Sequence, residues 1–437
     1  MQKTTFSSVI ANRGFLNLWI NQILVQLSYN SLNFALIIWV FSLTGSNTAV
    51  SALLFAVYLP AVILGLFAGV LVDVIDRKKI ILAINILLSL SFFSLIFLKD
   101  SYPAILLVAF FVNALGQFYA PTEASAIPLI VKRNQLITAN SIFSATLYSC
   151  FLLGFGLAGP AIAHLGIDFV FGFEGVALML GSILALSFPS IITKPDQQGK
   201  KLLVALAKRK YADIKAIGIL EIVKTMKLIK GKLPVLTSIG ILAGVQMVIG
   251  ILAVLVPGFL ENSLKIKSTN ASYILVIPLG LGIVLGGLIL GKIGHKFVRR
   301  LLVGRAIFFG GLLFFLVGLA PLSTILVVGS FLLGVAMVSI LIPSQTVLQE
   351  NTPEQDRGKV FSVLGMVMAA VSLIPVFLVG IMADLFGTAP IFTGLGIIIM
   401  MIGLFSLKPS LFLPGKLLPY RVKEFLGMGH WEERDVS

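Results

Sequence analysis

The sequence of 437 residues is poor in the residues that soluble proteins and metal sites need. Only 12% of the residues are charged, which is about half the fraction usual in soluble globular domains. There is one cysteine, Cys150, so a disulfide within the chain is excluded. The three histidines, His164, His295 and His430, are far apart and lack the close ligand spacing of a zinc site. We therefore expect neither a soluble protein nor a bound metal.

Long apolar runs take the place of the missing charges. Apolar residues make up 58% of the chain, and their runs are long enough to cross a hydrocarbon core of about 30 Å as helices. They lack the alternation of apolar and polar residues that a membrane β-barrel needs. The sequence therefore predicts an all-α membrane protein. We expect twelve transmembrane helices, at 15–43, 48–72, 79–99, 103–126, 138–163, 168–190, 233–257, 271–293, 301–320, 322–345, 359–384 and 388–408.

The basic residues lie mainly on one side of this topology. Thirty of the 33 Lys and Arg residues fall in or beside the even-numbered connections and the two termini, and only Lys99, Lys265 and Lys267 lie on the other side. The positive-inside rule then places both termini in the cytoplasm. We interpret the net charge of +15 as an orientation signal at the membrane surface and expect no nucleic-acid partner.

The spans divide the chain into two halves of six. We expect an N-terminal six-helix bundle at 1–190, a connection at 191–232, a C-terminal six-helix bundle at 233–408 and a cytoplasmic tail at 409–437. The connection interleaves lysines with Leu, Ile and Val, which is typical of an amphipathic helix on an anionic membrane surface. It is either a simple tether between the halves or a lipid-binding regulatory element.

A short motif after the second span recurs 218 residues later, after the eighth. It reads Gly69-x3-Asp73-x3-Arg77-Lys78 in the first half and Gly287-x3-Gly291-x3-His295-Lys296 in the second. This recurrence indicates a duplicated six-helix unit, a plan in which the substrate site lies between the halves.

The first copy of the motif resembles the loop between the second and third helices of the major facilitator superfamily. The sequence departs from the family pattern at Asp76, where glycine is usual. The resemblance implies two pseudo-symmetric six-helix bundles and a gating role for the motif. Asp73 would face the positive N-terminus of the eleventh helix, while Arg77 and Lys78 would anchor the loop.

A second stretch is similar to the connection between the tenth and eleventh helices in a bacterial efflux branch that includes macrolide and siderophore exporters. It runs from Pro343-Ser344-Gln345-Thr346 to Pro353-x3-Arg357-Gly358-Lys359. The resemblance implies secondary transport of small molecules, and it specifies no substrate.

Two glycine-rich stretches imitate nucleotide-binding loops. Gly154-x-Gly156-x-x-Gly159 has no strand before it, and Gly286-x4-Gly291-Lys292 has Ile293 where the magnesium-binding Ser or Thr belongs. Both lie in predicted spans, so we expect no nucleotide and no other cofactor.

Polar residues inside the spans are the candidates for a substrate cavity. Four amide side chains of the first span lie within an arc of about 80° at 100° per residue, and such a stripe is costly to expose to lipid. The alternative is hydrogen bonding between helices without substrate contact. The candidates are Gln22, Gln26, Asn30 and Asn33 in the first span, Asn113 and Gln117 in the fourth, and Gln246 in the seventh.

Charged residues inside the spans are scarce: Glu123, Glu174 and Arg305. Arg305 lies near a span end, where it can extend to the interface. A carboxyl group that exchanges a proton alternately with the two sides is what proton coupling requires. Glu174 and Glu123 are therefore the proton-coupling candidates, although Glu174 could instead reach the outer interface or bond a neighbouring helix.

These observations predict a monomeric, multi-pass secondary transporter of the inner cell membrane, surrounded by the lipid bilayer. We expect proton-coupled efflux of small amphiphilic substrates by alternating access. A lysophospholipid or siderophore transporter is the alternative within the same class. A non-transporting membrane enzyme or receptor is the alternative from another class, and it lacks the clustered His, Asp or Cys that an enzyme would need.

Overall fold

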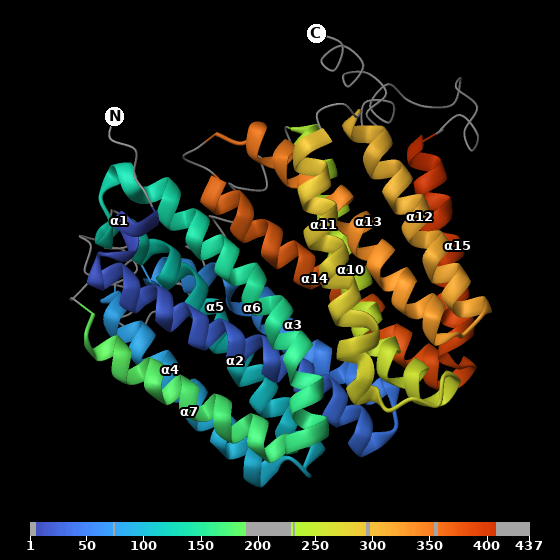
Figure 1. Ribbon diagram of the computed structural model, residues 1–437, viewed down its shortest axis with the longest axis horizontal. Helices are drawn as coiled ribbons and strands as arrows, with labels where there is room; N and C mark the ends of the chain where they lie inside the picture. The colour runs from blue at the N-terminus through green and yellow to red at the C-terminus, as the bar shows by residue number, and fades with distance from the viewer. Residues whose placement is uncertain are drawn as a thin grey trace. The chain divides into compact units, whose positions relative to one another are not determined.

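A computed structural model describes residues 6–72, 75–188, 229, 232–293, 298–353 and 357–407, and in these ranges the chain is helical without strands (Figure 1). Twelve of its helical segments are long and apolar enough to cross a membrane, as the sequence predicts. The main helices are α1 (Phe6–Ile10), α2 (Arg13–Thr44), α3 (Asn47–Val72), α4 (Arg77–Leu98), α5 (Tyr102–Ile130), α6 (Leu136–Leu165), α7 (Ile167–Leu186), α10 (Leu233–Gly258), α11 (Ile277–Ile293), α12 (Arg299–Leu319), α13 (Ser323–Glu350), α14 (Arg357–Phe386) and α15 (Thr388–Leu407). Short helical turns are η1 (Arg133–Gln135), η2 (Phe259–Ser263), η3 (Ser268–Asn270) and η4 (Ser272–Val276).

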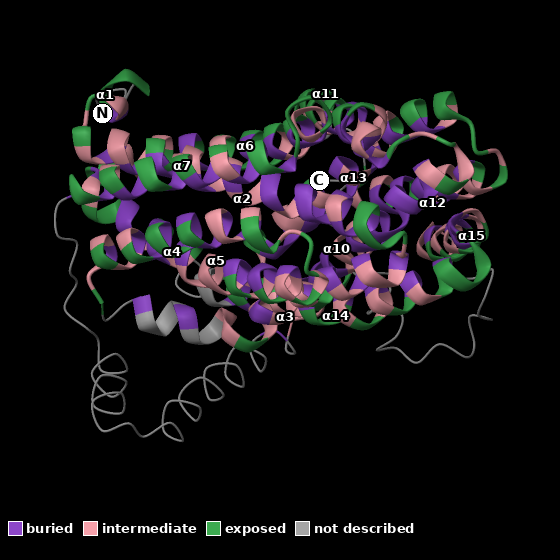
Figure 2. Cartoon of the chain, turned by 90° about the horizontal axis from the view of Figure 1, so that it is seen from below, coloured by how far each residue is buried: buried purple, intermediate pink, exposed green. Residues whose placement is uncertain are grey.

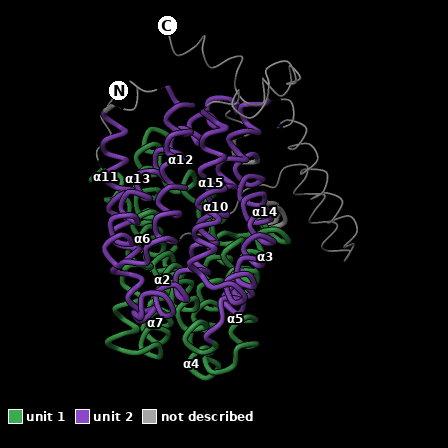
Figure 3. Tube along the Cα trace, turned by 90° about the vertical axis from the view of Figure 1, so that its right-hand side faces the viewer, with its two compact units in different colours: residues 1–44, 55–223 green, residues 45–54, 224–437 purple. Residues whose placement is uncertain are grey.

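The chain forms two compact units, coloured separately in Figure 3. Unit 1 contains residues 1–44 and 55–223, and unit 2 contains residues 45–54 and 224–437. The division therefore falls inside α3, whose first eight residues group with unit 2.

Four helix pairings occur in both units. In unit 1, α2 packs against α5 and α6, and α4 packs against α5 and α7. In unit 2, α10 packs against α13 and α14, and α12 packs against α13 and α15. The pairing of the first helix with the fourth and fifth, and of the third helix with the fourth and sixth, therefore recurs in both halves, which is the tertiary counterpart of a duplicated six-helix unit.

The exposed faces of the helices are apolar. Buried and exposed patches alternate along α4 and α7 in Figure 2, and the most exposed large side chains include Phe97 (85%) and Ile137 (83%). Side chains of this kind on the outside of twelve long helices fit a hydrocarbon solvent, because lipid tails are as apolar as they are.

Glycines allow the closest helix contacts in both units. In unit 1, a Cβ at Gly154 of α6 would lie 2.9 Å from the backbone nitrogen of Ser31 on α2. In unit 2, a Cβ at Gly282 of α11 would overlap the carbonyl oxygen of Phe331 on α13. Gly291 has open space around it, and Gly287 has only ordinary contact distances. The glycine-rich stretches are thus helix-packing surfaces, although the tight positions differ from the two glycines of the repeated motif.

Several predicted features lie outside the described residues. These are Asp73, His295 and Lys296 of the repeated motif, the tail at 409–437, and the connection at 191–232 except for Ile229 and Lys232.

Candidate functional site

A polar cluster joins α2 and α5 inside unit 1. The hydroxyl of Tyr29 donates a hydrogen bond to Oδ1 of Asn113. The Asn113 side-chain amide donates to Oδ1 of Asn33 at 3.3 Å and to the carbonyl of Ala109 at 2.8 Å. Tyr29 passes over Gly116, where a Cβ would lie 3.2 Å from its hydroxyl oxygen. The structure thus brings together two of the predicted cavity residues and adds Tyr29.

The other predicted cavity residues make different contacts. Gln22 is buried and its amide donates to the carbonyl of Phe143 on α6 at 3.2 Å. Asn30 donates to the carbonyl of Gln26 in its own helix, and Gln117 donates to the carbonyl of Asn113 in its own helix. Gln246 lies half-buried on α10 in unit 2. The stripe on α2 therefore divides between the contact with α5 and the contact with α6.

A second polar cluster surrounds Glu123, which is 6% exposed on α5. The hydroxyl oxygen of Tyr119 lies 3.1 Å from Oε1 of Glu123 and 3.0 Å from Oδ1 of Asn21 on α2. The side-chain amide of Asn21 donates to the carbonyl of Gly181 on α7 at 2.9 Å. A Cβ at Gly181 would lie 3.2 Å from that amide nitrogen, so this glycine provides the space for the contact. The cluster thus connects three helices of unit 1.

The hydrogens of this cluster can be counted. A tyrosine hydroxyl has one hydrogen to donate, and Tyr119 faces the carboxyl oxygen of Glu123 and the amide oxygen of Asn21. If Glu123 is ionised, both neighbours are acceptors and one of them receives no hydrogen. If Glu123 carries a proton, it donates to Tyr119, and Tyr119 donates to Asn21. The geometry is therefore completed by one proton on the carboxyl group.

Glu174 lies on α7 and is also buried, at 6% exposure. Its carboxyl group bonds the hydroxyl of Ser31 on α2, while Oε2 is buried with no hydrogen-bond partner among the described residues. The neighbouring Gly175 carbonyl accepts a hydrogen bond from Ser89 of α4 at 2.8 Å. Glu174 therefore faces the interior of unit 1 and contacts a neighbouring helix, which fits both a structural role and the predicted proton-coupling role. A buried carboxyl group in this setting is costly when charged.

The basic residues of the repeated motif fasten α4 within unit 1. The guanidinium of Arg77 donates to the hydroxyl of Ser125 on α5 at 2.9 Å, and Nζ of Lys78 donates to the carbonyl of Leu186 at the end of α7 at 2.6 Å. Asp76 caps α4 by accepting from the backbone nitrogen of Lys78 at 3.1 Å. Asp76, the position that departs from the family pattern, is thus the N-cap residue of α4.

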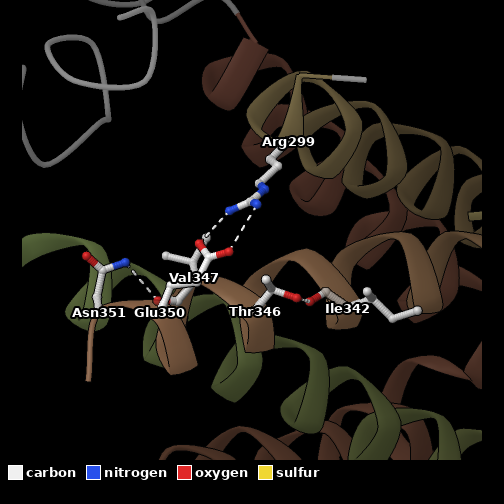
Figure 4. A network of polar contacts seen from close by, with 6 residues as sticks. All are labelled: Arg299, Ile342, Thr346, Val347, Glu350 and Asn351. Carbon is white, nitrogen blue, oxygen red and sulfur yellow. Dashed lines mark hydrogen bonds and ion pairs between the residues drawn. The ribbon is translucent and has the colours of Figure 1, made fainter. Parts of the chain in front are cut away.

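Unit 2 makes the equivalent contacts with a different pair of basic residues. Arg299, the first residue of α12, forms a two-pronged ion pair with Glu350 at the end of α13, at 2.7 and 3.2 Å (Figure 4). Arg300 donates to the carbonyl of Ser406 near the end of α15 at 3.3 and 3.2 Å. Each unit therefore ties its third helix to its fourth and sixth. The sequence does not single out Arg299 and Arg300, because the motif repeats through its glycines, whereas these arginines correspond to Arg77 and Lys78 only by their place at the start of a helix.

The structure offers no site for a metal within the described residues, since no group of three or more metal-binding side chains occurs there.

Tyr29, Tyr119 and Asn21 are further site residues that the sequence analysis did not identify. The two tyrosines read as ordinary aromatic residues of apolar runs, and only their partners on other helices give their hydroxyls a role.

The chain is similar over most of its length to known membrane transporters. The family model described as "Major Facilitator Superfamily" matches residues 18–374 and 239–422. Macrolide efflux protein A from Streptococcus pyogenes is 25% identical over 387 residues, which cover 85% of this chain and 90% of the relative. The putative bacilysin exporter BacE from Bacillus subtilis (strain 168) is 25% identical over 341 residues, covering 78% and 80%. The solved structure of an auto-inhibited POT family peptide transporter has a TM-score of 0.70 at 14% identity, covering 92% and 97%.

Proposed function

The chain belongs to the major facilitator superfamily, and from this premise we propose that it exports small amphiphilic molecules by proton-coupled alternating access. The membership and the likeness to a solved transporter confirm the predicted fold class and the resemblance found in the motifs. The chain is accordingly a multi-pass membrane transporter and not an enzyme.

The export direction is supported by the relatives. One is named for macrolide efflux and another as a bacilysin exporter, and both align over more than three quarters of this chain. The amide and hydroxyl groups of Tyr29, Asn33 and Asn113 are the substrate-contacting groups we propose on the first and fourth spans. The two helices that carry these groups are otherwise mainly apolar, and sites with a few polar groups among apolar ones suit amphiphilic substrates.

The single observation that carries the coupling proposal is the hydrogen count around Tyr119. Glu123 completes the cluster with Tyr119 and Asn21 when it carries a proton, and loss of that proton leaves one acceptor without a donor. Protonation therefore changes the bonding between α5 and α2. Because the proposed substrate contacts involve the same two helices, this change would link the proton to the substrate. Glu174, bonded to Ser31 on α2, is the second proposed proton carrier.

We further propose that the protein works as a monomer in the inner cell membrane with both termini in the cytoplasm. The excess of basic residues in the termini and even-numbered connections supports this orientation.

Purified protein in liposomes provides the test. A panel of fluorescent dyes, antibiotics, siderophores and lysophospholipids is measured for counterflow, with and without an imposed pH gradient. The proposal expects counterflow of at least one amphiphilic compound and its accumulation against a gradient only when protons flow the opposite way. Substrate accumulation that is the same with and without the pH gradient would rule out proton coupling. Counterflow of lysophospholipids alone would favour the lipid-transporting alternative.

A further inference from the structure

The carboxylate of Asp384, near the end of α14, binds the beginning of α3. Its Oδ1 accepts hydrogen bonds from the backbone nitrogen and the side-chain amide of Asn47, at 2.8 and 2.9 Å. Its Oδ2 accepts from the hydroxyl of Ser46 at 2.6 Å and from the backbone nitrogen and hydroxyl of Thr48 at 2.9 and 2.6 Å. All of these residues belong to unit 2. One carboxylate thus receives five donors from a segment 336 to 338 residues away in the sequence.

This contact is more than an ordinary helix cap. The hydroxyl of Ser46 already caps α3, since it accepts from the backbone nitrogen of Ala49 at 3.2 Å. Asp384 binds the remaining free nitrogens of the first turn and places a negative charge at the positive end of the helix. The helix can therefore begin without Asp384. What Asp384 adds is attachment of that helix end to α14.

The packing below the carboxylate is equally close. The hydroxyl of Ser51 donates to the carbonyl of Val376 on α14 at 2.9 Å. A Cβ at Gly380 of α14 would lie 2.6 Å from the carbonyl oxygen of Asn47, and a Cβ at Gly258 of α10 would overlap the Asn47 side chain. Asn47 and Ser51 are both buried. The first two turns of α3 are thus held by hydrogen bonds, and two glycines on neighbouring helices leave the room that these turns occupy.

The contact lies at the part of α3 where the chain divides between the two units. Residues 45–54 belong to unit 2, and the rest of α3 belongs to unit 1. Alternating access moves one half of such a transporter against the other. The start of α3 therefore belongs to one of the two moving parts and the rest of the helix to the other.

We propose that Asp384 acts as a latch during alternating access. Its hydrogen bonds hold the start of α3 against α14 in the present conformation and break in the opposite one. The inference rests on the proposed transport function. It assigns a conformational role to a residue outside both recognised motifs.

A crosslink tests whether the latch must open. Thr48 and Asp384 are replaced by cysteine in a Cys150→Ala background, and the pair is joined by oxidation or by a short bifunctional thiol reagent. Transport in liposomes should fall to the level of protein-free vesicles and return on reduction of the disulfide. The matched control joins Lys99→Cys to Asp168→Cys, which replaces an ion pair within unit 1, and this crosslink should leave transport unchanged. Full transport by the Thr48–Asp384 crosslinked protein overturns the proposal, as does failure of that pair to crosslink.

A labelling experiment tests the latch without any measurement of transport. Ser51→Cys is buried under the contact, and its reaction with a water-soluble maleimide should become several-fold faster when Asp384→Ala is added. Asp100→Ala, which removes another exposed acidic side chain, is the control and should not change the rate. An unchanged rate in the Asp384→Ala protein would overturn the latch even if transport is normal. Absence of transport in the unmodified protein, with the labelling response intact, would instead count against the proposed function.

Discussion

The hydroxyl oxygen of Tyr119 lies 3.1 Å from the carboxyl oxygen of Glu123, one helical turn further along α5, and 3.0 Å from the side-chain oxygen of Asn21 on α2. Glu123→Gln should keep this arrangement, because a glutamine amide can donate to Tyr119 as the protonated acid does. We expect the variant to exchange substrate across the membrane normally and to lose accumulation driven by a pH gradient. Parallel counterflow and gradient-driven uptake measurements check this.

Tyr119→Phe is the companion to that variant. It removes the hydroxyl between Glu123 and Asn21 and should weaken coupling while leaving the carboxyl group in place. A Glu123→Gln protein that still concentrates substrate on a pH gradient would assign the coupling proton to another residue.

Glu174→Gln separates the two carboxyl candidates. If Glu174 carries a transported proton, the variant loses gradient-driven accumulation and retains energy-independent exchange. Ser31→Ala removes the hydroxyl that bonds Glu174 and should shift the pH dependence of uptake without abolishing it. Proton-driven accumulation by a well-expressed Glu174→Gln protein would show that this carboxyl group is structural.

Asn113→Ala should weaken substrate binding. Besides its bonds to Asn33 and Tyr29, the variant loses the proposed hydrogen bond from Asn113 to the substrate. Loss of one such bond costs about 1 kcal/mol, or roughly fivefold in KM. Asn17→Ala is the control on α2, because Asn17 bonds Ser187 instead. Equal KM values for Asn113→Ala and Asn17→Ala would exclude the α2–α5 cluster from substrate contact.

Asp73→Asn tests the gating motif that carries the family resemblance. A charge at a helix end contributes roughly 1–2 kcal/mol in favourable geometry, so we expect a strong loss of transport with expression and substrate binding retained. Asp76→Asn is the control, because asparagine caps a helix about as well as aspartate. Transport by Asp73→Asn at the rate of Asp76→Asn would remove the gating role from this residue.

Single cysteines test the predicted orientation in a Cys150→Ser background. A water-soluble maleimide added to intact cells should label Asn270→Cys, and it should label Lys200→Cys and His430→Cys only after the cells are opened. Labelling of Lys200→Cys in intact cells would overturn the twelve-span orientation.

The sequence alone determined the twelve spans and the superfamily. Both depend on local properties of the chain: the length of an apolar run, the short motif after the second span and the similar stretch near Pro343. A span requires about 20 apolar residues whatever its neighbours are. The two buried carboxyl groups could also be identified, because an acidic residue in an apolar run is rare enough to be noticed without a structure.

Only the tertiary structure decided which side chains meet. On α4, Phe92 is fully buried and Phe97 is 85% exposed, yet the two are chemically identical. Both lipid and protein interiors accept apolar residues, so a membrane helix has no polar stripe that marks its outer face. For the same reason the sequence could not pair Tyr119 with Asn21, or Asp384 with the start of α3. Those pairs join helices distant in the chain, and the rotation of each helix that brings them together is fixed by packing.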